Sequence, residues 1–188
     1  AQTLMTHSGH ADNGFYINEW QQLSDVLQRL EDAGQKTLLL GVTFALLDFA
    51  AAHPLRLRHT VVMETGGMKG RRQEMTRGEV HAYLKGQFGL GAIHSEYGMT
   101  ELLSQAYAAA DGLFSCTGTI KVLVRDINDP LDVGYAGQGG LNIVDLANIH
   151  SCAFVATDDI GHVSADGTFE VLGRLDHSAR RGCSLMAL

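Results

Sequence analysis

The chain has 188 residues, of which 45% are hydrophobic, and this is enough for one sizeable folded domain. A net charge of −7 argues against a general nucleic-acid-binding role, because such proteins present a broad basic surface. No apolar run reaches the ~18 residues of a membrane span and no signal peptide opens the chain, so we expect no membrane span and a cytoplasmic location.

The first half of the sequence alternates between helix and strand patterns. A stripe of apolar side chains over residues 18–33 predicts an amphipathic helix. Continuous apolar runs at residues 36–42 and 58–65 are typical of strands buried on both faces, and a third strand is predicted at 91–95.

Two further helices are expected between these strands. One begins near residue 43 and is closed by Pro54. The other begins after Thr76, which is placed to cap it together with Glu79 in a capping box. The order strand, helix, strand, helix, strand predicts a parallel α/β sheet.

The pattern changes to short β-rich runs over residues 113–172, with Asp166 and Gly167 as a hairpin turn. Cys116 and Cys152 fall within these runs and are expected in the core. We divide the chain into an α/β sheet subdomain (1–112), a β-rich section (113–172) and a tail (173–188).

Glycines follow the second predicted strand, at the edge of a parallel sheet where ligands bind. Gly66 and Gly67 would let backbone N–H groups approach a ligand closely. The alternative is a tight loop in which the nearby basic side chains of Lys69, Arg71 and Arg72 are simply solvated.

The sequence Tyr97-Gly98-Met99-Thr100-Glu101 follows the third predicted strand. Tyr97 offers a flat face for a base, Gly98 permits a turn, and the Thr100 hydroxyl can bond a phosphate oxygen. The Glu101 carboxylate can hold a Mg²⁺ ion that also binds phosphates. The alternative is a loop in which Thr100 caps a helix containing Leu102 and Leu103.

Two acidic residues, Asp158 and Asp159, lie at the end of a β-rich run. A carboxylate there can accept hydrogen bonds from ribose hydroxyls, and Arg174 could reach a phosphate or the ribose. The alternative is that the two Asp residues form a turn.

Taken in this order, the three motifs resemble those of the adenylate-forming superfamily of acyl- and aryl-CoA ligases, luciferases and peptide-synthetase adenylation domains. "YGMTE" is similar to its Tyr-Gly-x-Thr-Glu motif, "TDDIG" to its Thr-Gly-Asp-Leu-Gly motif, and "GRLD" to the start of its hinge motif. The segments "METGGMKGRR" and "GRLDHSARRGC" resemble more narrowly the acyl-protein synthetase family, which includes the synthetase subunit of the bacterial bioluminescence fatty-acid reductase.

This resemblance implies the C-terminal part of an adenylate-forming core that uses ATP and Mg²⁺. It implies that a fatty or other carboxylic acid attacks the α-phosphate, giving acyl-AMP and pyrophosphate. The acyl group would then pass to a cysteine near the C-terminus, where Cys183 is the matching position, and from there to an acyl-reductase partner.

The residues around Cys183 support this role independently. Arg180 and Arg181 would favour the thiolate, which is the nucleophile, and Gly182 would give the tail mobility. The alternative is that Cys183 is a small apolar filler.

The sequence also departs from the superfamily pattern. The Ser/Thr/Gly-rich phosphate loop is absent from the chain, Asp158 replaces a glycine, and no C-terminal catalytic lysine follows the hinge motif. We therefore expect a fragment of a larger enzyme. Two alternatives stay open: a phenylacetate-type CoA ligase, and a non-catalytic nucleotide-binding or interaction module.

Overall fold

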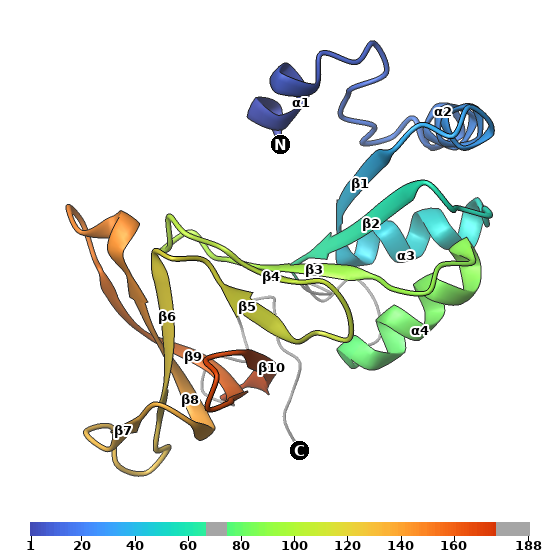
Figure 1. Cartoon of the computed structure of the whole chain (residues 1–188). Helices are drawn as coiled ribbons and strands as arrows, with labels where there is room; N and C mark the ends of the chain where they lie inside the picture. The colour runs from blue at the N-terminus through green and yellow to red at the C-terminus, as the bar shows by residue number, and fades with distance from the viewer. Residues whose placement is uncertain (67–74, 176–188) are drawn as a thin grey trace.

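The computed structural model describes residues 1–66 and 75–175, which fold around one mixed sheet of ten strands (Figure 1). The strand order is β1-β2-β3-β4-β5-β10-β9-β8-β6-β7. The strands are β1 (Thr37–Val42), β2 (Thr60–Thr65), β3 (His94–Tyr97), β4 (Ala106–Ala108), β5 (Phe114–Cys116), β6 (Ile120–Arg125), β7 (Val133–Gly134), β8 (Gly137–Asp145), β9 (Phe154–Val163) and β10 (Phe169–Arg174). The helices are α1 (Gln2–Ser8), α2 (Trp20–Asp32), α3 (Thr43–Ala52), α4 (Arg77–Phe88) and the short 3-10 helix η1 (Leu146–Asn148).

The predicted α/β architecture is confirmed. Strands β1, β2 and β3 are neighbours and run parallel, and every other pairing in the sheet is antiparallel. Helices α3 and α4 lie against one face of this parallel part (Figure 1). The sheet therefore changes from parallel to antiparallel after β3, so that β3 borders both parts.

The expectation that the first two strands are buried on both faces is wrong. Leu38 on β1 and Val61 on β2 keep 48% and 41% of their surface exposed, whereas Val62 is fully buried. Val62 packs against the helices, whereas Leu38 and Val61 are paired on the opposite face and remain exposed there. The apolar runs therefore identified the two strands correctly but did not establish whether one or both of their faces are covered.

The predicted capping box at the start of α4 is confirmed. The Thr76 hydroxyl accepts a hydrogen bond from the Glu79 N–H at 3.3 Å, and the Glu79 carboxylate accepts one from the Thr76 N–H at 2.7 Å. Gly89 ends the helix with φ of 68°, a conformation that glycine adopts without strain. The capping box fixes where α4 begins, just before Arg77, and Gly89 fixes where it ends.

The antiparallel part contains the predicted hairpin and one wrong expectation. Gly167 has φ of 84° in the turn between β9 and β10, as the Asp166-Gly167 pair predicted. Cys116 is half-buried on β5 beside the core, but Cys152 is exposed. Cys152 lies in the connection between η1 and β9 and is in no strand, so its side chain meets solvent.

Two hydrophobic clusters hold the sheet together. The first packs α2, α3 and α4 against β1 and β2 and contains Leu47, Leu84 and Phe88. The second lies within the antiparallel part around Phe114 and Phe169, and Tyr97 at the end of β3 belongs to it. None of the helices in the described ranges has the length and apolar character that a membrane-spanning helix requires.

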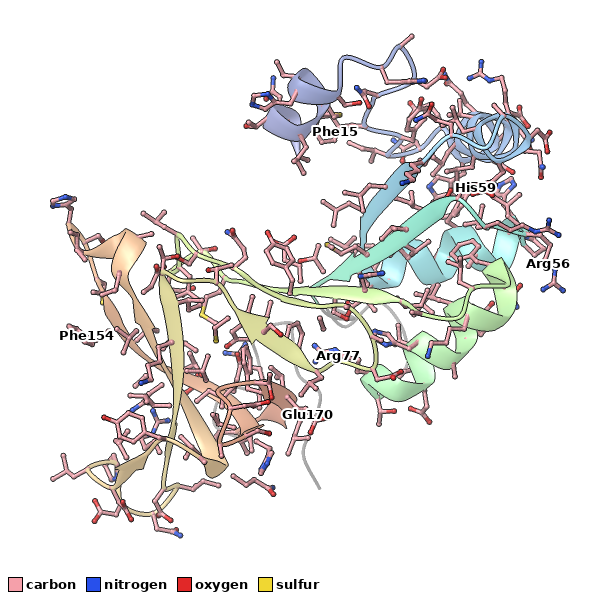
Figure 2. The ribbon with its side chains drawn as sticks, in the orientation of Figure 1. Phe15, Arg56, His59, Arg77, Phe154 and Glu170 are labelled. Atoms are coloured by element: carbon pink, nitrogen blue, oxygen red, sulfur yellow. The ribbon has the colours of Figure 1, made fainter. Side chains whose placement is uncertain are left out.

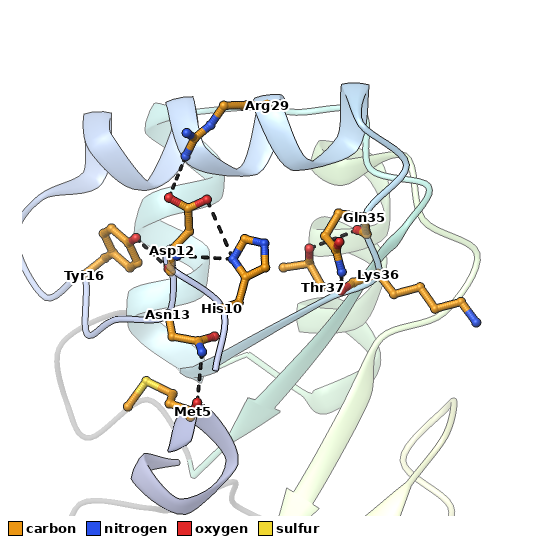
Figure 3. Close-up of polar contacts among 9 residues, drawn as sticks. All are labelled: Met5, His10, Asp12, Asn13, Tyr16, Arg29, Gln35, Lys36 and Thr37. Carbon is orange, nitrogen blue, oxygen red and sulfur yellow. Dashed lines mark hydrogen bonds and ion pairs between the residues drawn. The ribbon is translucent and has the colours of Figure 1, made fainter. Parts of the chain in front are cut away.

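The N-terminal segment is joined to α2 mainly through Asp12 (Figure 3). Its carboxylate lies 2.7 Å from Arg29 Nη2 on α2, and its carbonyl oxygen accepts a hydrogen bond from the Tyr16 hydroxyl at 2.9 Å. Helix α1 contributes no buried residue. These contacts are polar and mostly exposed, so we expect this segment to add little stability.

Glu31, near the end of α2, connects that helix to the start of β2. Its carboxylate accepts hydrogen bonds from the Arg58 and His59 N–H groups at 2.7 and 3.0 Å and from the Thr60 hydroxyl at 2.6 Å. Burial alone would raise the pKa of Glu31, but these bonds outweigh it, and the pKa lies below its usual 4.5.

We expect Glu31→Gln to lower the free energy of unfolding by about 1 kcal/mol at pH 7, because the amide cannot accept all three bonds. Because the folded state depresses the Glu31 pKa, the carboxylate stabilises the fold above pH 4.5 and this contribution is lost as the pH falls further. Urea denaturation at pH 7 and pH 3.5 measures both effects. Asp32→Asn, on the same helix, is the control and should have little effect; an equal loss in both variants, or one independent of pH, would contradict the account.

Candidate functional site

A cavity of about 420 Å³ lies at the carboxyl ends of β2 and β3, where the parallel part of the sheet meets β9 and β10. Residues from six separated segments line it. Among them, Gly66 follows β2, Tyr97 ends β3, Thr157 to Asp159 come from β9, and Arg174 ends β10. A cavity of this size is in the range of small-molecule sites.

The hydroxyl of Tyr97 donates a hydrogen bond to Asp159 Oδ2 at 2.7 Å across this cavity wall. The two residues lie 62 positions apart in sequence and both are buried. Arg174 completes the group, since its Nε lies 3.1 Å from Asp159 Oδ1. Strand pairing explains this contact, because Arg174 stands opposite Asp159 in the β9–β10 ladder.

The titration of this group follows from its burial. Burial raises the pKa of the Asp159 carboxyl, although the Tyr97 hydrogen bond and the Arg174 charge both lower it. Burial also raises the pKa of the Tyr97 phenol well above 10.0, and the Asp159 charge adds to that rise. Tyr97 therefore stays protonated and acts as the donor.

Arg174 has donor capacity to spare. Its Nε atom is close to Asp159 but no hydrogen bond to a described residue satisfies it, so the contact is an ion pair without good alignment. Nη2 lies 3.8 Å from Asp158 Oδ2, a loose contact at the cavity rim. Nε is buried, so a ligand oxygen in the cavity would take its hydrogen bond from a terminal nitrogen of this guanidinium group.

The Tyr97 ring lies largely in the core, with 7% of the residue exposed. It packs edge-on against Phe169, with ring centroids 5.4 Å apart, and tilted against Phe114 at 5.9 Å. The predicted flat face for a base is therefore a small part of the cavity wall. The firmer role of Tyr97 in this structure is to orient Asp159.

The loop after Tyr97 is not the start of a helix, so the helix alternative is wrong. Residues 98–105 form turns, with the Leu102 N–H bonded to the Met99 carbonyl at 3.1 Å. Gly98 and Glu101 line the cavity, whereas Thr100 is exposed in the turn and does not line it. Four of the five side chains expected to converge thus meet here: Tyr97, Glu101, Asp159 and Arg174.

A buried polar network, not anticipated from the sequence, forms the inner wall of the cavity. Glu64 on β2 is 3% exposed and accepts a hydrogen bond from the Thr43 hydroxyl at 2.6 Å. Its other oxygen lies 3.5 Å from Arg77 Nε and 3.6 Å from His81 Nε2. His81 Nε2 also lies 3.1 Å from the hydroxyl of Ser95, a fully buried residue.

This network keeps Glu64 ionised. Burial alone would raise the pKa of Glu64, but the His81 hydrogen bond, the Arg77 charge and the bonds from Ser95 and Thr43 outweigh it. The pKa therefore lies below 4.5. A charged residue inside the apolar strand "TVVMET" was the available signal for this network, because such a residue needs partners when it is buried.

Asp145 and Asn148 hold the loop that carries Glu101, and sequence reasoning missed both. The fully buried Asp145 accepts hydrogen bonds from the N–H groups of Leu103 and Ser104 at 2.7 and 2.9 Å and from the Ser104 hydroxyl at 2.6 Å. Asn148 donates to the Glu101 carbonyl oxygen at 2.9 Å. The β8–β9 connection thereby fixes the backbone at the cavity rim.

Two of the predicted site residues, Gly67 and Cys183, lie outside the described residues. The basic residues that follow Gly67 and those that precede Cys183 also lie outside them. Gly66 is described: it has φ of 78°, lines the cavity, and accepts a hydrogen bond from Thr43 through its carbonyl oxygen at 3.2 Å. A glycine is required there because other residues are strained at this φ.

The charges around the cavity favour a ligand that brings a cation with it. Five carboxylates line the cavity, from Glu64, Glu96, Glu101, Asp158 and Asp159, against the guanidinium groups of Arg77 and Arg174. The described residues contain no cluster of three or more ligating side chains arranged to hold a metal ion by itself. Glu101 at the rim does fit the way Mg²⁺ binds with phosphates, through one or two carboxylates and several waters.

Comparison with solved structures finds the same fold within several larger proteins. Superposition on ATP-bound MatB from Rhodopseudomonas palustris covers 82% of this chain and 33% of that protein, with a TM-score of 0.59 and 14% sequence identity. Coronafacic acid ligase from Pectobacterium brasiliense gives a TM-score of 0.55 at 17% identity over 81% of this chain and 32% of that one. O-succinylbenzoate coenzyme A synthetase from Bacillus subtilis gives a TM-score of 0.50 at 18% identity, over 81% of this chain and 36% of that one.

These likenesses confirm the expected fold, which is that of part of the adenylate-forming enzymes. The chain spans about a third of the length of the structures it matches. No protein-family model matches the chain, and the comparison with curated proteins found no match.

We expect Tyr97→Phe to raise the pKa of Asp159 further, because the substitution removes the hydrogen bond that stabilises its carboxylate but keeps the ring in the core. A pH titration of carboxyl ¹³C chemical shifts measures it. Tyr107→Phe is the control, since Tyr107 lies on β4 and does not line the cavity. An unchanged or lowered Asp159 pKa in Tyr97→Phe would contradict the assigned hydrogen bond.

Proposed function

We propose that this chain carries the nucleotide-binding part of an adenylate-forming ligase, which uses ATP to activate a carboxylic acid as acyl-AMP. The observation that carries the proposal is the meeting of Tyr97, Asp159 and Arg174 around one cavity, beside Glu101. Three independent sequence motifs converge in space, which is what a shared ligand requires. The fold shared with ATP-bound MatB supports the same ligand.

Each residue has a role consistent with its surroundings. Asp159 accepts hydrogen bonds from the ribose hydroxyls, and Tyr97 keeps its carboxylate oriented toward them. Arg174, whose side chain lines the cavity, donates from a terminal nitrogen to the ribose or a phosphate oxygen. Gly66 and Gly98 line the cavity and let the backbone approach the nucleotide, and Gly67, the next residue in sequence after Gly66, is proposed to share this role. Thr100 does not line the cavity, so no phosphate contact is assigned to it.

Glu101 is the proposed magnesium ligand. Magnesium bound between this carboxylate and the phosphates would neutralise charge on the nucleotide. The five carboxylates of the cavity make such neutralisation important, because a bare triphosphate would be repelled by them. The Asn148 bond to the Glu101 carbonyl oxygen keeps this residue at the cavity rim.

In the reaction, a carboxylate oxygen of the acid forms a bond to the α-phosphorus. The bond from that phosphorus to the oxygen bridging to the β-phosphate breaks, and pyrophosphate leaves with the electron pair. In the described part of the chain, the Arg77 and Arg174 guanidinium groups are the cations that can stabilise the charge developing on the phosphate oxygens.

We expect Asp159→Asn to weaken binding of ATP with Mg²⁺ by about 10- to 100-fold, because a charged acceptor for the ribose hydroxyls is lost. Isothermal titration calorimetry on the natural protein measures it, with circular dichroism as the check on folding. Asp132→Asn is the matched control, since Asp132 is exposed and lies outside the cavity. Equal affinity in Asp159→Asn and the unsubstituted protein would contradict the nucleotide site.

The acyl group then passes to a thiol, and we propose Cys183 as its acceptor. The thiolate attacks the acyl carbonyl, a thioester forms, and AMP leaves. Arg180 and Arg181 precede Cys183 in sequence and favour the thiolate form. The resemblance to acyl-protein synthetases suggests a fatty acid as substrate and an acyl-reductase as the partner that takes the acyl group.

We expect Cys183→Ser to abolish a hydroxylamine-sensitive acyl label on the protein while leaving ATP- and acid-dependent pyrophosphate release largely intact. Incubation with ATP and a radiolabelled fatty acid, followed by peptide mapping, measures the label. Cys152→Ser is the control, because Cys152 is exposed and yet has no role in the proposal. A label on Cys116 or Cys152, or product formed only with added CoA, would contradict Cys183 as the acceptor, and a CoA requirement would favour a CoA ligase.

A further inference from the structure

Arg77, the first residue of α4, brings a cation into the proposed nucleotide cavity, and three contacts hold its side chain in place. Its Nε lies 3.5 Å from Glu64 Oε1, and its guanidinium carbon lies 4.9 Å from the centre of the Phe114 ring. Its Cδ passes over Gly112, where a Cβ atom would lie only 2.8 Å away. Figure 2 shows Arg77 in the space between α4 and the antiparallel strands. The ion pair and the ring together restrict where the guanidinium group can point.

Glu64, which pairs with this arginine, is itself held from several sides. Its Oε2 accepts a hydrogen bond from the Thr43 hydroxyl at 2.6 Å, and its Oε1 lies 3.6 Å from His81 Nε2. The same nitrogen of His81 lies 3.1 Å from the hydroxyl of Ser95. These partners belong to α3, α4 and β3. The carboxylate is therefore anchored to three elements, and the guanidinium group is anchored to the carboxylate.

We propose that Glu64 is a positioning residue for the adenylation reaction and that it acts through Arg77. This rests on the proposed function, in which the Arg77 guanidinium group stabilises the charge that develops on the phosphate oxygens. The ion pair with Glu64 is made through Nε, so the two terminal nitrogens stay available as donors to a phosphate oxygen. Glu64 itself contacts no reacting atom in this assignment.

The cavity also offers Arg77 a competing partner, which is why its direction has to be held. Burial raises the pKa of Asp159, and the charge of Arg77 is one of the influences that lower it, so the two side chains interact. A guanidinium group on a long, flexible side chain would turn toward such a carboxylate if Glu64 did not hold it. Arg77 would then compete with the ribose for Asp159 and be lost to the phosphates. A cation that is already aligned stabilises a transition state best, because it does not have to reorganise during the reaction.

The test compares Glu64→Gln, Arg77→Ala and the double variant in the natural protein. Glutamine keeps the size of Glu64 but loses the charge that attracts the guanidinium group. The measurement is kcat for pyrophosphate release with ATP, Mg²⁺ and octanoate, per mole of protein shown to be folded by urea denaturation. Glu170→Gln is the matched control, since Glu170 is exposed on β10 and does not line the nucleotide cavity.

We expect Glu64→Gln to lower kcat about tenfold and Arg77→Ala to lower it about 100-fold, with ATP affinity within about twofold of the unsubstituted protein. The double variant should match Arg77→Ala, because Glu64 has nothing to position once the guanidinium group is gone. Free guanidinium ion at a non-denaturing concentration should restore kcat several-fold in Arg77→Ala but not in the double variant. Urea, which has a similar shape and no charge, should restore neither, and Glu170→Gln should match the unsubstituted protein.

Thr43 gives a second test that does not depend on Glu64→Gln folding. Thr43→Val removes the hydroxyl that holds Glu64 but keeps the shape of the side chain, whereas Thr43→Ser keeps the hydroxyl. We expect Thr43→Val to lower kcat several-fold and to increase the motion of the Arg77 Nε–H group, measured by ¹⁵N relaxation. Thr43→Ser should restore both the activity and the order of this group.

The outcomes separate this inference from the proposed function. Normal ATP affinity with losses that multiply in the double variant would overturn the positioning role alone, as would guanidinium rescue that does not require Glu64. Unchanged kcat and unchanged Arg77 motion in both Glu64→Gln and Thr43→Val would also overturn it. Failure of the unsubstituted protein to bind ATP would overturn the proposed function, and the positioning role with it.

Discussion

The hydrogen bond between the Tyr97 hydroxyl and the Asp159 carboxylate joins the two halves of this fold. Tyr97 ends β3, the last of the parallel strands, and Asp159 lies on β9 within the antiparallel part. This bond stabilises the fold because it is buried, and a buried carboxylate without a hydrogen-bond donor would destabilise the folded state. The cavity exists between these strands because their ends are held at this spacing.

Two other polar groups support the same spacing from either side. On one side Glu64, Thr43, Arg77 and His81 fill the space under the parallel strands with a satisfied network. On the other, Asp145 accepts bonds from the backbone after Glu101. A buried polar network that is fully paired specifies one arrangement strongly, since any other would leave a charge unpaired.

Much of the fold follows from local sequence. The apolar period of α2, the runs in β1 and β2, and the Thr76 capping box each depend on residues a few positions apart, and all are confirmed. Predictions of burial, which depend on tertiary packing, were wrong in two places: β1 and β2 are covered on one face only, and Cys152 is exposed. The loop after Tyr97 was ambiguous, because a Thr followed by leucines suits both a helix and a turn held by a distant Asp145.

The site was anticipated as a set of motifs but not as a set of contacts. That Asp159 and Arg174 stand opposite each other depends on an irregularity between Val171 and Gly173, which shifts the register of β10. A shift of one residue moves side chains to the other face of a sheet, and no short-range pattern in the sequence announces it. That Arg77 of α4 lines this cavity likewise depends on long-range packing of α4 beside the sheet.

The central claim is that the cavity bounded by Tyr97, Asp159 and Arg174 holds ATP. The most direct measurement is a crystal structure of the natural protein with Mg²⁺ and a non-hydrolysable ATP analogue. The account predicts ribose hydroxyls within hydrogen-bond distance of Asp159, a donor contact from Arg174, and a magnesium ion beside Glu101. A nucleotide bound elsewhere on the molecule, with Asp159 in contact only with Tyr97 and Arg174, would contradict it.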